Sequence, residues 1–320
     1  MVDQVTLADV DFIGEGLDRP ECVLTTATGD TYTSYRHGVA HVAPDGTTRL
    51  IAAKNAPEGF MPNGIALIPG REFLIANLGP TGGVYRMSQD GSLTPVLLEI
   101  EGKRMPATNF VGIDRAGRTW ITVSTWVFPR EQVARKDWAD GFVIVMDDKG
   151  ARIVAEGIGY TNEGIVDPTG QFLYVNETMG RRLSRFPIRP DSSLGDKEVV
   201  CQFGAGTFPD GFAYDENGDV WVVSVVSNRV IHVNTKTGKE TLVLEDADPA
   251  NVVAAEHRYQ TANVDRLTMD SGRHRTLGNV ASIGFGGPDL RTVHLGSLFA
   301  SRIARFRTSI AGAEPVQWKF

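Results

Sequence analysis

The chain has 320 residues and a net charge of −7, and 42% of its residues are hydrophobic against 22% charged. This composition supports a folded core, and the negative charge, without a run of Lys or Arg, argues against nucleic acid and anionic membranes as partners. No apolar stretch approaches the roughly 20 residues that span a bilayer. Residues 1–10 lack a basic region followed by an apolar core, so we expect no secretory signal and a cytoplasmic protein. Cys22 and Cys201 are expected to be small buried side chains rather than a disulfide.

The chain repeats a unit of four short strands. After a lead-in whose residues 10–13 predict an outer strand, the repeats begin near residues 20, 61, 107, 160, 208 and 280. In the repeat at 208, β-branched and aromatic runs flank a turn at Gly218, which is typical of a hairpin. Repeats of about 40–50 residues indicate propeller blades, which bury both faces of their sheets by stacking on one another. We therefore predict an all-β, six-bladed β-propeller with four-stranded antiparallel blades, in which residues 1–320 form one domain.

Two segments interrupt the repeats, residues 124–141 in the third and residues 244–279 between the fifth and the sixth. Loops this long inside a compact domain are usually functional covers or disordered excursions. Helical periodicity is strongest at residues 130–138 and 248–259. The aromatic residues Trp126 and Phe128 favour a packed cover, and they either form a wall of the substrate site or only pin the insert to the ring.

One position of the repeat carries an oxygen-bearing side chain in five of the six copies. Each of these residues precedes a turn glycine by eight positions, or by seven for Asn63: Glu21, Asn63, Asn109, Asn162 and Asp210. The innermost strand of a propeller blade lines the central channel, so these side chains should point toward one axis. A lone residue of this kind is also explained by a hydrogen bond within a turn.

The convergence of these side chains favours a bound cation. Two carboxylates and several amides around one axis would repel or stay unsatisfied unless positive charge lay among them. Oxygen ligands suit a hard divalent cation, and the absence of Cys or His at these positions argues against a softer transition metal. We predict one divalent cation, with Ca²⁺ as the first choice and Mg²⁺, Mn²⁺ or Zn²⁺ left open. Its candidate ligands are the two carboxylates and two or three of the amides in this group.

The sequences around these residues resemble a known family. They are RPECV at Glu21, TNFVGIDRAGRTW at Asn109, TNEGIVDPTGQFLYV at Asn162 and FPDGFAYDENGDVWV at Asp210, with NVASIGFGGPDLRTV in the last repeat. Together they are similar to the senescence marker protein-30/gluconolactonase/regucalcin-like family of six-bladed propellers, over nearly the whole chain. The resemblance implies that these four residues hold a divalent cation in the channel and that the chain hydrolyses lactones.

Three positions depart from the usual pattern of that family. Phe110 stands where the family often has aspartate, Ala107 where it often has a sugar-binding arginine, and Glu163 where glycine is common. These changes leave the cation ligands in place and argue against a sugar acid as the substrate. Phe110 and the aromatic insert favour a more apolar lactone. The predicted substrate-binding residues are Asn63, Phe110, Glu163, Trp126 and Phe128.

The predicted chemistry is ester hydrolysis at the cation. An open coordination position would polarise the lactone carbonyl, and water activated by the cation, by Asp210 or by both would attack it. Asp210 is the predicted catalytic residue, either as a base within hydrogen-bond reach of that water or as the nucleophile itself. The expected partner is a small-molecule lactone or ester, and the expected class is a carboxylic ester hydrolase.

Two other functions are compatible with the same residues. A phosphotriester hydrolase would share every cation ligand, and a non-catalytic propeller would bind a ligand or partner on the face that carries the inserts. Metal content separates the non-catalytic propeller from the hydrolases, whereas only substrates separate the two hydrolases. Neither the oligomeric state nor the mobility of the inserts follows from the sequence.

Overall fold

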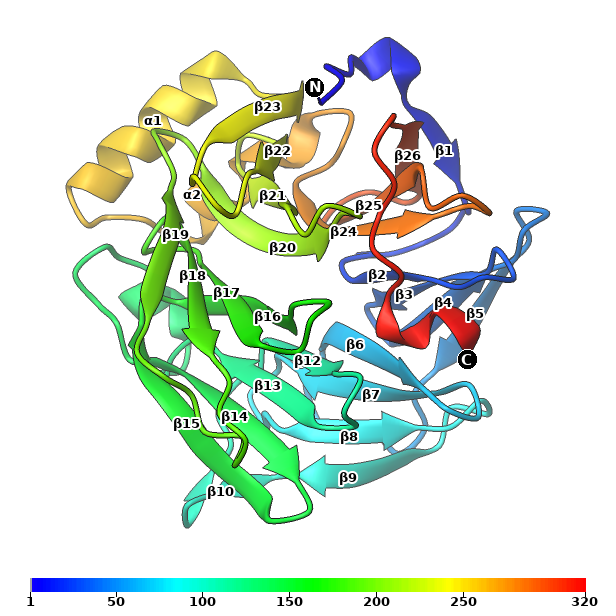
Figure 1. Ribbon diagram of the computed structural model, residues 1–320, viewed down its shortest axis with the longest axis vertical. Coiled ribbons are helices and arrows are strands. Elements are labelled where there is room, and N and C mark those ends of the chain that lie inside the picture. The colour runs from blue at the N-terminus through cyan, green and yellow to red at the C-terminus, as the bar shows by residue number, and fades with distance from the viewer. Residues whose placement is uncertain (1) are drawn as a thin grey trace.

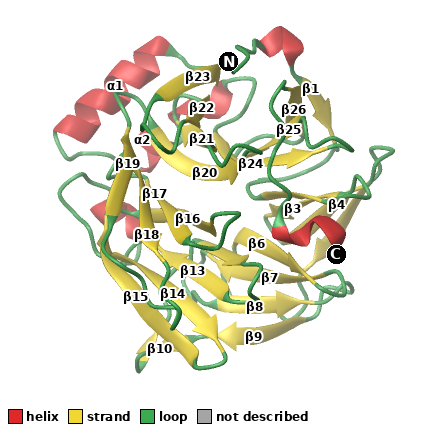
Figure 2. Cartoon of the chain, viewed as in Figure 1, coloured by secondary structure: helices red, strands yellow, loops and turns green. Residues whose placement is uncertain are grey.

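The computed structural model describes residues 2–320 and shows six four-stranded sheets arranged around a central axis (Figure 1). Strands within a sheet pair antiparallel, as in the sheet that begins with Phe208. The predicted six-bladed propeller is thus confirmed. The few helices lie around the sheets rather than between them (Figure 2). Within the described residues, none of them is long and apolar enough to cross a membrane.

The blades follow one another along the chain, and the strand named first in each lies beside the central channel. Blade 1 comprises β2 (Val23–Thr25), β3 (Thr31–Tyr35), β4 (Gly38–Val42) and β5 (Thr48–Ala52), and blade 2 comprises β6 (Pro62–Ile68), β7 (Glu72–Asn77), β8 (Val84–Met87) and β9 (Leu93–Leu97). Blade 3 comprises β12 (Phe110–Ile113), β13 (Thr119–Val123), β14 (Gly141–Asp147) and β15 (Gly150–Ile158), and blade 4 comprises β16 (Thr161–Val166), β17 (Phe172–Glu177), β18 (Arg182–Pro187) and β19 (Glu198–Gln202). Blade 5 comprises β20 (Phe208–Tyr214), β21 (Val220–Val225), β22 (Arg229–Val233) and β23 (Glu240–Glu245), and blade 6 comprises β24 (Val280–Gly286), β25 (Thr292–Ser297), β26 (Ile303–Arg307) and β1 (Asp11–Ile13).

Strands from distant parts of the chain close the ring. β1 pairs antiparallel with β26, so that Phe12 lies opposite Ala304. The Asp11 carboxylate accepts two hydrogen bonds from Arg305, each 2.8 Å long. β1 is the outer strand predicted from residues 10–13, and it covers the edge of β26 that would otherwise expose unpaired backbone groups.

The hydrophobic core is divided among the interfaces between neighbouring blades. Trp221 and Phe285 pack edge to face between blades 5 and 6, with ring centroids 5.4 Å apart. Leu17, Val42 and Ile303 pack between blades 1 and 6. Similar clusters join the other neighbouring blades. Because each sheet buries both faces in this way, the closed ring rather than any one blade is the stable unit.

A buried aspartate and a tryptophan fix one hairpin in blade 3 and another in blade 5. Asp114 accepts hydrogen bonds from two backbone N–H groups of its turn and from Trp120 Nε1, at 2.8–3.0 Å. Asp215 accepts the same three kinds of bond, the one from Trp221 Nε1 being 3.2 Å long. Both tryptophans are fully buried. These bonds lock the turns at the far ends of the inner strands β12 and β20.

The two inserts contain most of the helical structure. Residues 244–279 form α1 (Pro249–Gln260), which begins where the Asp248 carboxylate accepts a hydrogen bond from Ala250 N, followed by α2 (Arg266–Met269) and η3 (Ser271–His274). In residues 124–141 only the short turn η2 (Arg130–Val133) forms, because Ala134 leaves the helical dihedral region. The remaining elements are η1 (Leu7–Asp9), β10 (Glu99–Ile100), β11 (Lys103–Arg104) and η4 (Val316–Lys319).

Removal of residues 2–14 should open the ring and destabilise it. The variant loses β1 together with the apolar side chains of Val5 and Phe12, which pack against the junction of blades 5 and 6. Since each large buried apolar side chain contributes about 1.5–3 kcal/mol, we expect the unfolding free energy to fall by about 3–5 kcal/mol. Calorimetry on the intact chain should show one transition if residues 1–320 form one domain. A variant that melts at the intact chain's temperature would contradict the closing role of β1.

The pH dependence of stability should carry a contribution from His294. This side chain is buried on β25, and burial, followed by the nearby Arg305, lowers its pKa to about 4. The unfolded chain takes up the proton near pH 6.5, so between these values it binds more protons and stability falls as the pH falls. Between pH 7.5 and 4.5 we expect the intact chain to lose about 2 kcal/mol more than His294→Gln. Urea unfolding of both proteins at both pH values tests this prediction. Equal losses of unfolding free energy in the intact chain and in His294→Gln would contradict it.

Candidate functional site

The five oxygen-bearing side chains of the repeat lie at the entries of five inner strands. Glu21 and Asn109 precede β2 and β12, whereas Asn63, Asn162 and Asp210 lie within β6, β16 and β20. All five are buried, with exposed fractions between 2% and 7%. Asn63 Nδ2 lies 3.4 Å from Asn109 Oδ1, Glu21 interacts with Asn63 and Asp210, and Asp210 interacts with Asn162. The structure therefore brings the predicted group together at one end of the channel.

Bulges at the strand entries turn successive side chains toward the channel. An extra residue in one strand of a pair re-aims the side chains beside it. Asn162 faces a small cavity under the inserts, and Glu163 faces a larger cavity at the other end of the channel. The pairing register shifts between Pro62 and Ile65, between Thr161 and Gly164, and between Pro209 and Phe212.

Phe110 and Glu163 fill space beside glycines of a neighbouring blade. A Cβ atom on Gly64 would lie 2.5 Å from the ring of Phe110, and one on Gly211 would lie 2.8 Å from Glu163 Oε1. Neither contact leaves room for a larger residue. These two glycines therefore allow the side chains that depart from the family pattern to occupy the channel.

Two amide side chains of the group are oriented by hydrogen bonds to the residue that directly follows the second strand of their blade. Asn109 Nδ2 donates to Ser124 Oγ at 3.2 Å, and Asn162 Nδ2 donates to Thr178 Oγ1 at 3.0 Å. With the nitrogens fixed in this way, Asn162 Oδ1 is buried without a partner, as is Glu21 Oε2. Buried oxygens of this kind are costly unless a cation or water satisfies them. The residues present thus fit a hard divalent cation.

Two arginines that the sequence analysis did not single out lie beside this group. Arg19 donates to Asn63 Oδ1 at 2.6 Å and to the Pro62 carbonyl at 2.9 Å, so the amide oxygen of Asn63 is already occupied. Arg130, from the first insert, donates to Ser124 Oγ at 3.3 Å. Arg19 could have been suspected from its place next to the motif at Glu21, but no periodicity marks Arg130 within the insert.

The acidic side chains are perturbed by burial and by one another. Burial raises the pKa of Glu21, although Arg19 and Arg130 oppose the shift. Burial and then the charge of Glu21 raise the pKa of Asp210 well above its usual range. The pKa of Glu163 is raised by burial first and by Glu21 and Asp210 next, while its Oε2 accepts a hydrogen bond from Phe212 N at 3.1 Å. A cation among these groups would favour their ionised forms.

A small cavity of about 50 Å³ lies between this group and the inserts. Asn162 and Asp210 form part of its floor, and Arg130 and Arg266 reach it from the two inserts. Tyr160, Met179, Val225, Met269 and Leu298 add apolar surface. The inserts therefore cover the end of the channel where the oxygen-bearing side chains meet.

The remaining predicted substrate-binding residues lie elsewhere. Trp126 stacks on Phe142 with ring centroids 4.4 Å apart, and the Lys103 ammonium lies over the Trp126 ring, 5.1 Å from its centroid. It packs against the cluster between blades 2 and 3, which fits the pinning alternative. Phe128 is 52% exposed. In the described part of the chain, neither side chain lines the small cavity or the larger one.

A second acidic cluster occurs at the opposite end of blade 5. Asp215, Asp219 and His232 each offer a ligand atom within 4.8 Å of the others. Asp215 Oδ2 already lies 3.2 Å from Trp221 Nε1 and 3.3 Å from His232 Nε2. Asp219 accepts hydrogen bonds from Asn234 Nδ2 and from the backbone N–H of Thr235. Because its oxygens have partners, we interpret this cluster as part of the hairpin lock rather than as the cation site.

The fold and this group of side chains define a six-bladed propeller with an oxygen-lined centre at one end of its channel. The chain belongs to the SMP-30/Gluconolactonase/LRE-like family, whose model matches residues 22–256. The resemblance seen in the sequence motifs is thus confirmed.

Individual relatives are distant. A 6-deoxy-6-sulfogluconolactonase from Pseudomonas putida is 24% identical over 226 residues, which cover 69% of this chain and 65% of that protein, slightly less than two thirds of its length. A gluconolactonase from Xanthomonas campestris has a TM-score of 0.66 at 17% identity, covering 92% of this chain and 88% of its own. The calcium-binding protein regucalcin from Agrobacterium tumefaciens has a TM-score of 0.67 at 17% identity and covers 100% of both chains. At these identities the structural likeness shows the fold.

Calcium titration of the metal-stripped chain should reveal one site that depends on the buried carboxylates. Glu21→Gln and Asp210→Asn should each weaken binding by at least about tenfold, because each removes a charged side chain predicted to be a ligand. Asp45→Asn, in an exposed turn, is the matched control and should bind like the intact chain. Binding should also weaken as the pH falls, because the raised pKa values make protons compete for both carboxylates. Equal calorimetric affinities for all variants would contradict the site.

Proposed function

We propose that this protein is a divalent-metal-dependent lactone hydrolase, with Ca²⁺ as the favoured cation. The proposal depends chiefly on one observation: the buried, unpartnered oxygens of Glu21 and Asn162 beside the carboxylate of Asp210. Family membership supports it, because a curated relative and a structural neighbour carry the names of lactonases. Glu21, Asn109, Asn162 and Asp210 would hold the cation.

The bound cation would act as a Lewis acid that polarises an ester carbonyl. Asp210 borders the small cavity, so its carboxylate is placed to orient a water molecule and to accept its proton. Arg130 lies at the same cavity within electrostatic reach of Asp210 and Glu21, so its guanidinium could donate to the carbonyl oxygen as negative charge develops there. Asn63, held by Arg19, would keep Asn109 in place through the 2.8 Å bond to its carbonyl oxygen.

The substrate must enter on the side of the inserts, and this requires them to move. A cavity of about 50 Å³ has room for little more than a water molecule or two. The inserts touch each other through Lys136 and Gln260, 3.0 Å apart, and more loosely through Arg266 and Glu131 at 3.9 Å. Both contacts are exposed, so they resist opening only weakly. Ala107, which is buried and stands where the family often has a sugar-binding arginine, supports a lactone less polar than a sugar lactone, as do apolar side chains such as Met179 and Val225 in this partly polar cavity.

Lactone hydrolysis should depend on both the cation and Asp210. Proton release would be followed on aliphatic, aromatic and sugar lactones, with and without restored Ca²⁺. Because Asp210 is proposed as ligand and base, kcat/KM should fall about 10³-fold in Asp210→Asn and stay unchanged in Asp45→Asn. After a single turnover in ¹⁸O-labelled water, label in the Asp210 carboxylate shows that Asp210 acted as the nucleophile and that water then attacked the aspartyl carbonyl of the mixed anhydride; a base role places the label only in the product.

The assay has outcomes that count against the proposal. Hydrolysis of a phosphotriester but of no lactone, with the same metal dependence, would keep the cation site and replace the reaction. Calcium binding without turnover of either class would favour the non-catalytic propeller. Lactone turnover that survives metal removal would contradict the role given to the cation.

A further inference from the structure

The channel has a second cavity at the end opposite the oxygen-bearing group. Its volume is about 530 Å³, which is within the range of sites for organic ligands. The predicted cation ligands are not among the residues that line it in the described structure, because Cys22, Phe110, Glu163 and Phe212 lie between. The far end of every inner strand contributes: Thr25, Leu67, Ile113, Val166, Tyr214 and Phe285.

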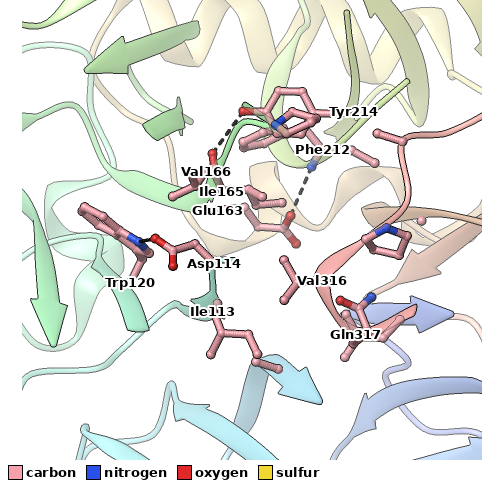
Figure 3. A pocket seen from close by; sticks show the side chains of 18 of the residues that line it. Ile113, Asp114, Trp120, Glu163, Ile165, Val166, Phe212, Tyr214, Val316 and Gln317 are labelled. Atoms are coloured by element: carbon pink, nitrogen blue, oxygen red, sulfur yellow. Dashed lines mark hydrogen bonds between the residues drawn. The ribbon is translucent and has the colours of Figure 1, made fainter. Parts of the chain in front are cut away.

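The wall of this cavity is mainly apolar and its inner end is polar. Ile113, Ile165 and Val166 lie on one side, and Val316 lies opposite Glu163 (Figure 3). The carboxyl group of Glu163 points into the space between them. One of its oxygens accepts the bond from Phe212 N, and the other points into the cavity (Figure 3). The site therefore offers one polar contact at the inner end of an apolar chamber.

The ionisable groups at the rim already have partners. Arg118 donates to the Asp114 carboxylate at 2.6 Å, and Arg115 donates to a backbone carbonyl at 2.7 Å. Asp167 accepts two backbone hydrogen bonds at 2.8–2.9 Å, and the Glu314 carboxylate lies 3.3 Å from a lysine ammonium. Arg115 and Asp167 bond only to uncharged groups and keep their charges at the rim. An anion deeper in the chamber would lie between apolar side chains and the Glu163 carboxyl, where burying it unpaired would be costly.

Residues 311–320 cross the outer mouth of this cavity. Ala313 N donates to the Tyr214 carbonyl of blade 5 at 2.9 Å, and Ala27 N of blade 1 donates to the Trp318 carbonyl at 2.8 Å. The segment thus spans the channel from one blade to another (Figure 1). It encloses the chamber and limits the size of what it can hold.

We propose that this end of the channel is a second binding site, for an uncharged and mainly apolar small molecule with one polar group directed at Glu163. The enclosure, the apolar wall and the Glu163 carboxyl at the inner end favour such a ligand over an anion. The site is separate from the cation centre, so its occupant would not need the metal.

Fluorescence titration with N-phenyl-1-naphthylamine, an uncharged apolar fluorophore, tests this site on the full chain. We expect saturable binding of one molecule with and without Ca²⁺. Ile113→Trp and Val316→Trp, which fill the chamber from opposite sides, should each weaken binding at least tenfold. Val253→Trp is the matched control, because Val253 is 70% exposed on α1, and it should bind like the intact chain. The anionic analogue 8-anilino-1-naphthalenesulfonate should bind at least tenfold more weakly.

The outcomes separate the second site from the cation centre. All variants should keep the calcium affinity of the intact chain, which also shows that they fold. Absence of saturable binding to the intact chain would overturn the proposal, and so would unchanged affinity in both tryptophan variants. Equal affinity for the anionic analogue would overturn the uncharged class of ligand. None of these results depends on whether the chain hydrolyses lactones.

Discussion

The burial of acidic side chains at the channel axis determines how the surrounding arginines and amides are arranged at this end of the molecule. Glu21, Asp210 and Glu163 resist ionisation because they are withdrawn from water and close to one another. Arg19 and Arg130 offset part of that cost, and the amide nitrogens are turned away toward the ends of the second strands. If this centre binds the cation proposed above, the cation would offset the cost of burying these acids, and metal affinity and folding stability would then be linked.

The same strands serve two different environments along one channel. The bulges place Asn162 toward a small polar chamber and Glu163 toward a larger apolar one, although the two residues are adjacent. Phe110 contributes to the separation by lying over Gly64. Substitutions on one inner strand can therefore change one chamber without the other, which is a useful property for a fold that hosts many activities.

Much of the fold and the positions of Glu21, Asn109, Asn162 and Asp210 could be predicted, because a repeated motif carries both strand spacing and channel-facing position. The bulges could not, since an extra residue in a strand leaves no mark on its hydrophobic pattern, and so the direction of Glu163 was not foreseen. The contribution of Arg130 depends on how an irregular insert folds back onto the ring. Trp126 belongs to the same insert, yet it packs on Phe142, because a large aromatic side chain gains more from an interblade core than from a wet cavity.

Closure by β1 has a consequence for how the molecule is made. The ion pair between Asp11 and Arg305 joins residues 294 positions apart, among the most distant contacts a chain of this length can form. During synthesis β1 therefore leaves the ribosome long before its pairing partner exists, and its edge must stay unpaired while the other blades assemble. Such non-local pairing slows folding and prolongs the lifetime of aggregation-prone intermediates. Until β26 emerges, the nascent protein is an open stack of sheets, and chaperones would find it most accessible in that period.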